Sequence, residues 1–170
     1  VNEYLQTNIP NIYAIGDVTG ISLYAHVASH QGLIAIDNIL GKKEKLDYNA
    51  VPRATFCEPQ IGSVGLTEEQ AKALGINPII GRFPFRALGY AISIGKWEGM
   101  VKLVANESRE LIGAHIIGPY ASSILGEVTL AVKEKIKLEE LADTIHAHPT
   151  LPEAIMEASF AGLNLPLHIV

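Results

Sequence analysis

The stretch His146-Ala-His-Pro-Thr-Leu-Pro-Glu153 decides how the rest of this 170-residue sequence is interpreted. It places two histidines, two prolines and a carboxylate within eight residues, directly before an apolar segment. Pro149 fixes its own φ and keeps His148 out of the α region, so the backbone turns sharply at His148. Glu153 follows this histidine by five residues. A glutamate at that spacing can reach back to the imidazole, fix its tautomer and favour its protonated form.

Two other interpretations of these residues stay open. Thr150-Leu-Pro-Glu153 fits the capping-box pattern of a helix that starts at Thr150, in which the glutamate only accepts a hydrogen bond from an unpaired N–H. The two histidines and the carboxylate would also provide three metal ligands, but Pro149 restricts the approach and the sequence contains no other ligand cluster. The residues alone favour neither the capping box nor a functional His–Glu pair, and they predict no metal site.

Composition and charge limit the classes of function. Thirteen basic against 18 acidic side chains give a formal net charge of −5, which argues against a nucleic-acid partner. We see neither a run of about 20 apolar residues nor a secretion signal, so we expect no membrane partner. The single cysteine, Cys57, excludes an intrachain disulfide and a zinc ribbon. It is compatible with a cytoplasmic protein, and we expect it in a buried strand.

The first part of the chain predicts a strand followed by a helix. Asn11-Ile-Tyr-Ala-Ile-Gly-Asp17 is a run of β-rich residues that ends in Gly16-Asp17. Gly16 would let the backbone approach a ligand, and Asp17 would stand at the carboxyl end of the strand, where open α/β sheets bind cofactors. On spacing alone we favour an ordinary strand-to-turn transition, because Gly-Asp is common in turns. A helix over residues 27–40 and a charged turn at residues 42–45 then lead to a domain boundary near residues 45–51.

The remainder predicts an antiparallel sheet with helices packed on it, which is the α+β class. The expected strands cover residues 54–57, 60–65, 79–85, 100–105 and 111–117. Turn residues at 106–110 join the last two strands into a hairpin, with His115 packed in its second strand.

Helices are expected between and after these strands. Thr67-Glu-Glu-Gln70 is a capping box that opens a short helix, which Gly75 ends. Ser122 or Ser123 would cap a longer helix with apolar residues at 3.6 spacing. Further helices are expected over residues 138–145 and 154–163.

The opening stretch resembles the C-terminal signature of the dihydrolipoamide dehydrogenase family of flavin disulfide oxidoreductases. The resemblance implies that His148 and Glu153 form an acid–base pair that enters the active site of the partner subunit. It also implies a cis bond between His148 and Pro149, which X-Pro bonds permit at low cost.

A second resemblance lies near the start of the chain. Thr7-Asn-Ile-Pro-Asn-Ile-Tyr-Ala-Ile-Gly-Asp17 is similar to the second FAD motif of this family. Leu23-Tyr24-Ala25-His26 takes the place of a segment that offers backbone groups to the flavin at a helix N-terminus, with Tyr24 departing from the usual residue. The resemblance therefore implies cofactor-binding residues at Gly16, Asp17, Leu23, Tyr24, Ala25 and His26.

The resemblance extends over nearly all of the chain. Residues 53–71 and 111–118 are similar to the family's dimerisation domain, so we expect a remnant of an FAD-binding domain at 1–47 and a dimerisation domain at 48–170. The implied parent is a cytoplasmic homodimer with a redox-active disulfide, FAD and NAD. It would oxidise dihydrolipoamide on the lipoyl domains of 2-oxo acid dehydrogenase complexes.

Several features of that parent are missing from this sequence. It contains no G-x-G-x-x-G turn, no C-x₄-C disulfide and no initiating methionine. We therefore expect the C-terminal third of the enzyme, inactive alone and without bound FAD or NAD. The alternatives are a non-catalytic dimerisation or interaction module, and part of a related glutathione or mercuric reductase, whose patterns fit less well.

Overall fold

The computed structural model describes residues 1–169, which form two compact units. The first unit is Val1–Tyr48, and the second begins at Asn49. Among the described residues, the helices are too short or too polar to cross a membrane.

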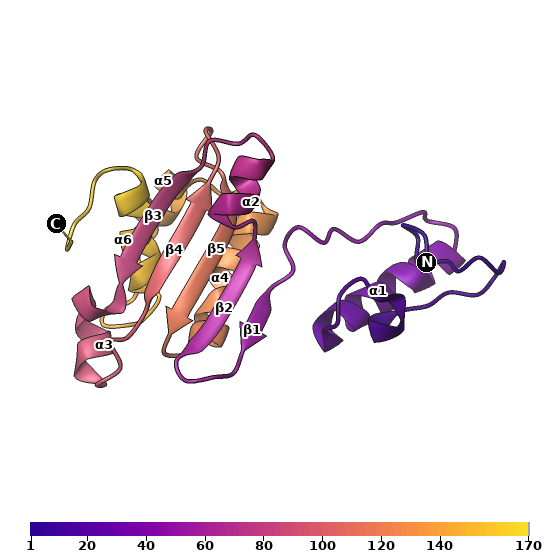
Figure 1. Ribbon diagram of the computed structural model, residues 1–170, viewed down its shortest axis with the longest axis horizontal. Coiled ribbons are helices and arrows are strands. Elements are labelled where there is room, and N and C mark those ends of the chain that lie inside the picture. Colours follow the sequence, from indigo (N-terminus) through magenta and orange to yellow (C-terminus); the bar gives the residue numbers. More distant parts are fainter. Residues whose placement is uncertain (170) are drawn as a thin grey trace. The chain divides into compact units, whose positions relative to one another are not determined.

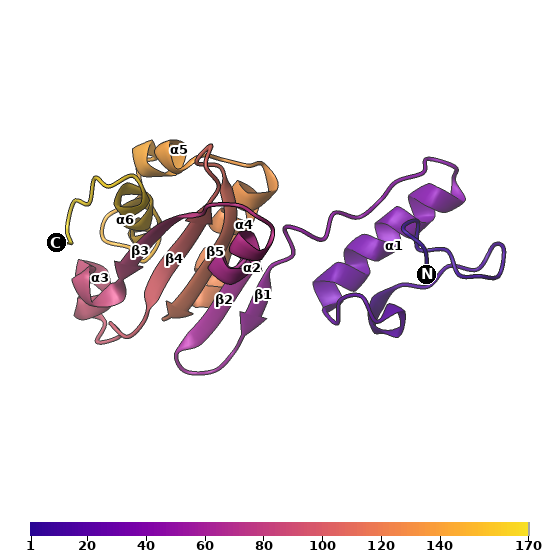
Figure 2. The same cartoon turned by 45° about the horizontal axis from the view of Figure 1, so that its top comes forward.

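The second unit is built on a five-stranded antiparallel sheet in the order β1-β2-β5-β4-β3. Its strands are β1 (Arg53–Thr55), β2 (Gln60–Gly65), β3 (Ile79–Pro84), β4 (Met100–Ala105) and β5 (Leu111–Gly118). Two helices, α4 (Ala121–Lys133) and α6 (Glu153–Gly162), cover one face of the sheet, and α5 (Leu138–Asp143) packs beside α6 (Figures 1 and 2). The predicted α+β class and the hairpin of β4 and β5 are confirmed.

The core lies between the sheet and these helices. Alternate strand residues face the helices, and the buried ones include Val64, Phe83, Val101, Leu103, Ala114 and Ile116. From α4, Ile124, Leu125 and Val128 complete the core at helical spacing. A Cβ atom on Gly81 would lie 2.0 Å from the carbonyl oxygen of Ala158, so this glycine permits the close approach of α6 to β3.

Three further short helices of the second unit are α2 (Glu68–Ala73), the 3₁₀ turn η2 (Phe85–Ala87) and α3 (Gly89–Ser93). The predicted capping box of α2 is confirmed, since Thr67 and Gln70 exchange hydrogen bonds. Hydrogen bonds from Lys102 and Lys72 lower the pKa of Glu68 to about 2. This ion-pair cluster links α2 to β4.

The first unit contains the 3₁₀ turn η1 (Gly16–Thr19) and helix α1 (Ala25–Ile39). The strand expected over residues 11–17 is wrong, because only Tyr13 pairs, in an isolated bridge to Gln6. A β-rich run needs a neighbouring strand to satisfy its backbone groups, and among the described residues this segment has only that bridge. The expected helix after residue 27 is confirmed and begins two residues earlier, at Ala25.

Two expectations for the second unit are also wrong. Cys57 is exposed and lies in the loop after β1, because β1 ends at Thr55 and Pro59 has no N–H for the ladder. Helix α4 has Tyr120 as its N-cap, in the left-handed conformation, and no serine cap. Ser122 instead donates its hydroxyl to Gln60 Oε1 at 2.8 Å, which ties the start of α4 to β2.

Candidate active site

The predicted turn lies between α5 and α6, on the helix side of the sheet. Helix α5 ends at Asp143 and α6 begins at Glu153, so the helix start expected at Thr150 is three residues too early. The His148-Pro149 bond is cis, as the resemblance implied. The side chain of His148 is 78% exposed and projects from the corner of the turn.

Glu153 holds this corner with both carboxylate oxygens. Its Oε1 lies 2.8 Å from Nδ1 of His148, and its Oε2 accepts a hydrogen bond from the Thr150 N–H at 2.7 Å. The Thr150 hydroxyl donates to the carbonyl of Ala147 at 2.6 Å and does not cap α6. The glutamate therefore pairs with the histidine and also accepts from the Thr150 N–H, but the predicted capping box is not formed, because Pro152 is the N-cap of α6 and the Thr150 hydroxyl accepts no bond from Glu153.

The bond to Glu153 determines which nitrogen of His148 is available. An ionised carboxylate only accepts hydrogen bonds, so Nδ1 of His148 carries a proton and donates it to Oε1. The other ring nitrogen, Nε2, makes no hydrogen bond with the described residues, and the side chain is 78% exposed. A neutral His148 thus presents an unprotonated Nε2 to the outside, which is the arrangement of a general base supported by a carboxylate.

The neighbouring His146 points the other way. Its side chain is only 6% exposed, its Nε2 lies 2.8 Å from Oε1 of Glu127 on α4, and its Nδ1 lies 2.9 Å from the carbonyl oxygen of Thr144. Glu127 could not be predicted from the sequence, because it lies nineteen residues from His146 on another helix and no local pattern joins the two.

The two histidines bind different carboxylates and do not converge on a common point. Within residues 1–169, no group of three or more histidine, cysteine, aspartate or glutamate side chains is placed to hold a metal ion. The geometry therefore gives the metal interpretation of His146, His148 and Glu153 no support.

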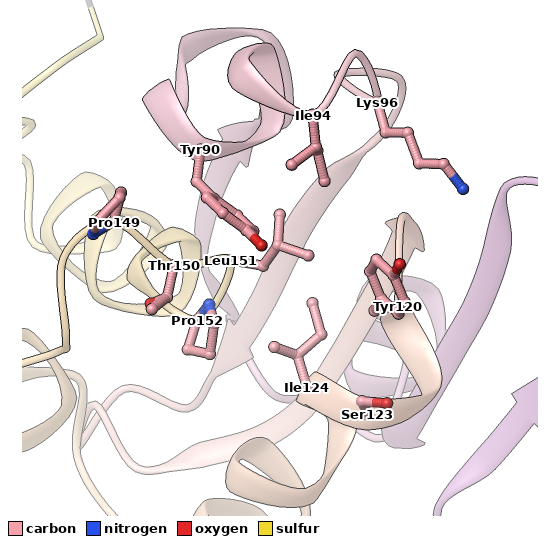
Figure 3. Close-up of a pocket in the computed structure, with 10 residues that line it drawn as sticks. All are labelled: Tyr90, Ile94, Lys96, Tyr120, Ser123, Ile124, Pro149, Thr150, Leu151 and Pro152. Atoms are coloured by element: carbon pink, nitrogen blue, oxygen red, sulfur yellow. The ribbon is translucent and has the colours of Figure 1, made fainter.

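An apolar cavity of about 540 Å³ borders the turn (Figure 3). Pro149, Thr150, Leu151 and Pro152 form one wall, and the remaining lining residues are Tyr90, Ile94, Lys96, Tyr120, Ser123 and Ile124. The turn that carries His148 therefore stands beside a surface suited to apolar groups.

The candidate cofactor residues lie in the first unit. Gly16 has a φ of +74°, and its N–H donates to the buried Gln31 at 2.6 Å. Asp17 is exposed, so its carboxylate is accessible to a hydroxyl-bearing ligand. Tyr24 is the N-cap of α1 but supplies no side-chain cap, and its ring stacks on that of His26 at a centroid distance of 5.2 Å.

These groups have the chemistry that part of an FAD molecule requires. The uncapped start of α1 offers backbone N–H groups, which suit carbonyl oxygens of a flavin ring, and Leu23 and Ala25 flank the N-cap. The carboxylate of Asp17 suits a ribityl or ribose hydroxyl. The residues present therefore fit the group that the resemblance implies.

Comparisons with known proteins agree with this architecture. Residues 51–159 match the family described as pyridine nucleotide-disulphide oxidoreductase, dimerisation domain, and residues 1–32 match the pyridine nucleotide-disulphide oxidoreductase family. The dihydrolipoyl dehydrogenase of Chlamydia muridarum is 46% identical over 97% of this chain and 36% of its own length. That of Bacillus subtilis is 44% identical over 99% of this chain and 36% of its own length.

Solved structures give the same result. LpdA from Mycobacterium tuberculosis superposes with a TM-score of 0.87 at 30% identity, covering 94% of this chain and 35% of that one. The flavoprotein disulfide reductase RclA from Escherichia coli has a TM-score of 0.81 at 25% identity, covering 91% and 36%. The chain spans about a third of the length of the curated relatives it matches. It belongs to the pyridine nucleotide-disulphide oxidoreductases, and residues 51–159 form their dimerisation domain.

Proposed function

We propose that this chain is a segment of an NAD-linked dihydrolipoamide dehydrogenase, in which it supplies the dimer interface and the acid–base pair His148–Glu153. The observation that carries the proposal is the exposed imidazole whose Nδ1 is bonded to Glu153 while Nε2 remains open. The similarity to two dihydrolipoyl dehydrogenases over nearly the whole chain supports the choice of substrate.

In this proposal His148 activates a thiol of dihydrolipoamide. The S–H bond breaks, the proton moves to Nε2, and the sulfur is left as a thiolate. This step is needed because the thiolate, not the thiol, attacks a disulfide. The carboxylate of Glu153 stabilises the imidazolium that forms and keeps the ring oriented. The disulfide under attack comes from outside this chain, which contains only Cys57.

The first unit would contribute to the flavin site. Asp17 would accept a hydrogen bond from a ribityl or ribose hydroxyl, with Gly16 allowing close approach. Residues 23–26 would offer backbone groups at the start of α1 to the ring. Bound FAD would supply the electron transfer between the disulfide and NAD.

The proposed partners follow from the same assignment. A second copy of the enzyme would complete the active site across a twofold interface, as the match to a dimerisation domain supports. The lipoyl domains of a 2-oxo acid dehydrogenase complex would deliver the substrate to the exposed corner. The single cysteine is compatible with the reduced environment of the cytoplasm, where we place the enzyme.

A chimera tests this proposal. In the chimera, this chain replaces the matching segment of the Bacillus subtilis dihydrolipoyl dehydrogenase, which is 44% identical to it. We expect a dimer that binds FAD and reduces NAD with dihydrolipoamide, but does not reduce glutathione disulfide. A chimera that is dimeric and loaded with FAD but fails to oxidise dihydrolipoamide contradicts the proposed function. That result would support the non-catalytic module, whereas activity with glutathione disulfide would support a related reductase.

A further inference from the structure

Both ring nitrogens of His146 are already committed to acceptors. The Thr144 carbonyl oxygen only accepts hydrogen bonds, so Nδ1 of His146 must donate to it. On the other side, a proton must lie between Nε2 and Oε1 of Glu127, since two lone pairs facing each other at 2.8 Å would repel. His146 therefore has no nitrogen left to exchange a proton with a substrate, which leaves it a positional role.

The position of Glu127 suits such a role. Helix α4, which carries it, is fixed on the sheet by Ile124, Leu125 and Val128, whose side chains are buried. A carboxylate on this helix is therefore a fixed point for whatever it binds. The side chain of Glu127 is one-third exposed, so the pair lies at the edge of the core.

The side chain of His146 attaches the first half of the turn to helix α4. The residues on either side of it are exposed, Ile145 at 96%, and the side chain of His148 is 78% exposed. Only His146, at 6%, reaches inward from residues 145–148. Removal of the Glu127 carboxylate would thus release the segment just before His148 and leave the core intact.

We propose that Glu127 is a positioning residue for His148 that acts through His146. Glu127 on α4 holds the segment before His148, and Glu153 on α6 holds the ring itself and the residues after it. The imidazole is thereby fixed from two helices that pack on the same face of the sheet. The attachment of the turn by Glu127 and Glu153 together is called the clamp below, and it is a property of this chain. Its catalytic meaning rests on the proposed function.

Hydrogen–deuterium exchange on the 170-residue chain tests the clamp directly. Glu127→Ala should raise the exchange of the Thr144 N–H, which donates to the Glu140 carbonyl at the start of this segment, and leave the interior of α4 protected. Glu127→Gln should restore protection, because its amide oxygen still accepts from Nε2–H. Glu134→Ala is the matched control. It removes a carboxylate at the C-cap of the same helix, seven residues after Glu127, whose side chain makes no hydrogen bond or ion pair with the described residues. Unchanged exchange in Glu127→Ala, or no recovery in Glu127→Gln, overturns the clamp.

The catalytic meaning is tested in the chimera. Glu127→Ala should lower kcat roughly tenfold, since small displacements of a catalytic group are costly, and should leave the KM for NAD unchanged. The same change in a His148→Gln background should have no further effect, because the imidazole that it positions is gone. An equal loss in both backgrounds shows a general structural role and overturns the proposal. If the His148→Gln chimera is itself fully active, the proposed function fails, and the exchange experiment alone decides whether the clamp exists.

Discussion

The turn before α6 carries two histidines that each pair with a glutamate but differ in their surroundings. Both have a nitrogen-to-oxygen distance of 2.8 Å. The His146 side chain is 6% exposed and uses both nitrogens, whereas that of His148 is 78% exposed and uses one. The first pair is therefore suited to holding the backbone, and the second to moving a proton.

We infer that a histidine suited to proton exchange differs from a structural one in the ring nitrogen that it leaves unbonded. A carboxylate partner is common to both pairs and does not separate them. The separating feature is the Thr144 carbonyl oxygen, which occupies Nδ1 of His146 and has no counterpart at Nε2 of His148 among the described residues.

The largest expected effect on turnover comes from removing the unbonded ring nitrogen of His148, Nε2. His148→Gln in the chimera should lower the turnover of dihydrolipoamide by roughly 10²–10⁴-fold, the usual scale for loss of a general base. Steady-state kinetics measure it, with FAD content and dimerisation as controls for folding. Activity close to that of the unmodified chimera would refute the role given to His148.

A smaller effect is expected when the carboxylate of the exposed pair becomes an amide. In Glu153→Gln the amide oxygen still accepts from the Thr150 N–H, so the amide NH₂ faces Nδ1 of His148 as a donor. This favours the tautomer with the proton on Nε2, which cannot accept the thiol proton. We expect a loss in kcat of roughly 10- to 100-fold, the scale of a charge-assisted hydrogen bond. A loss larger than that of His148→Gln would contradict the assignment.

Loss of the His146–Glu127 pair should lower kcat less than loss of the His148–Glu153 pair. His146→Ala should lower kcat roughly tenfold or less, because His148 and Glu153 remain and only the position of the turn is loosened. The substitution also leaves Glu127, a partly exposed carboxylate, in contact with water. If His146→Ala damages turnover more than His148→Gln, the roles of the two histidines have been exchanged.

The smallest expected effect is at Thr150. Thr150→Val removes the hydroxyl bond to Ala147 but keeps the backbone N–H that donates to Glu153. Because this bond is exposed, the free energy of unfolding should fall by about 1 kcal/mol or less, and turnover should hardly change. Thermal unfolding of the chain and kinetics of the chimera measure the two quantities. A large loss of turnover would mean that the hydroxyl acts beyond the local turn.

The sequence predicted the local parts of this site and missed the part that depends on tertiary packing. The approach of Glu153 to His148 follows from a spacing of five residues across a proline turn. The bond between Glu127 and His146 exists because α4 and the turn pack on one face of the same sheet, and no local spacing encodes that.

The errors in the fold have the same origin. The strand expected at residues 11–17 has the right residues but only one bridging partner among the described residues, at Gln6. Cys57 is apolar enough for a buried strand, but the following Glu58-Pro59 bond ends the ladder and leaves the thiol exposed. In both cases the outcome depends on the backbone of a neighbouring segment, which composition does not describe.

We propose to test whether Nε2 of His148 takes the proton from the thiol by measuring the two half-reactions of the FAD-loaded chimera separately. Stopped-flow absorbance follows flavin reduction by dihydrolipoamide and, separately, by NADH in the unmodified and His148→Gln enzymes. We expect His148→Gln to slow flavin reduction by dihydrolipoamide roughly 10²-fold or more. The rate with NADH should stay unchanged, because hydride transfer from NADH requires no thiol to be deprotonated. Equal slowing of both half-reactions, or no slowing of either, would contradict this role of His148.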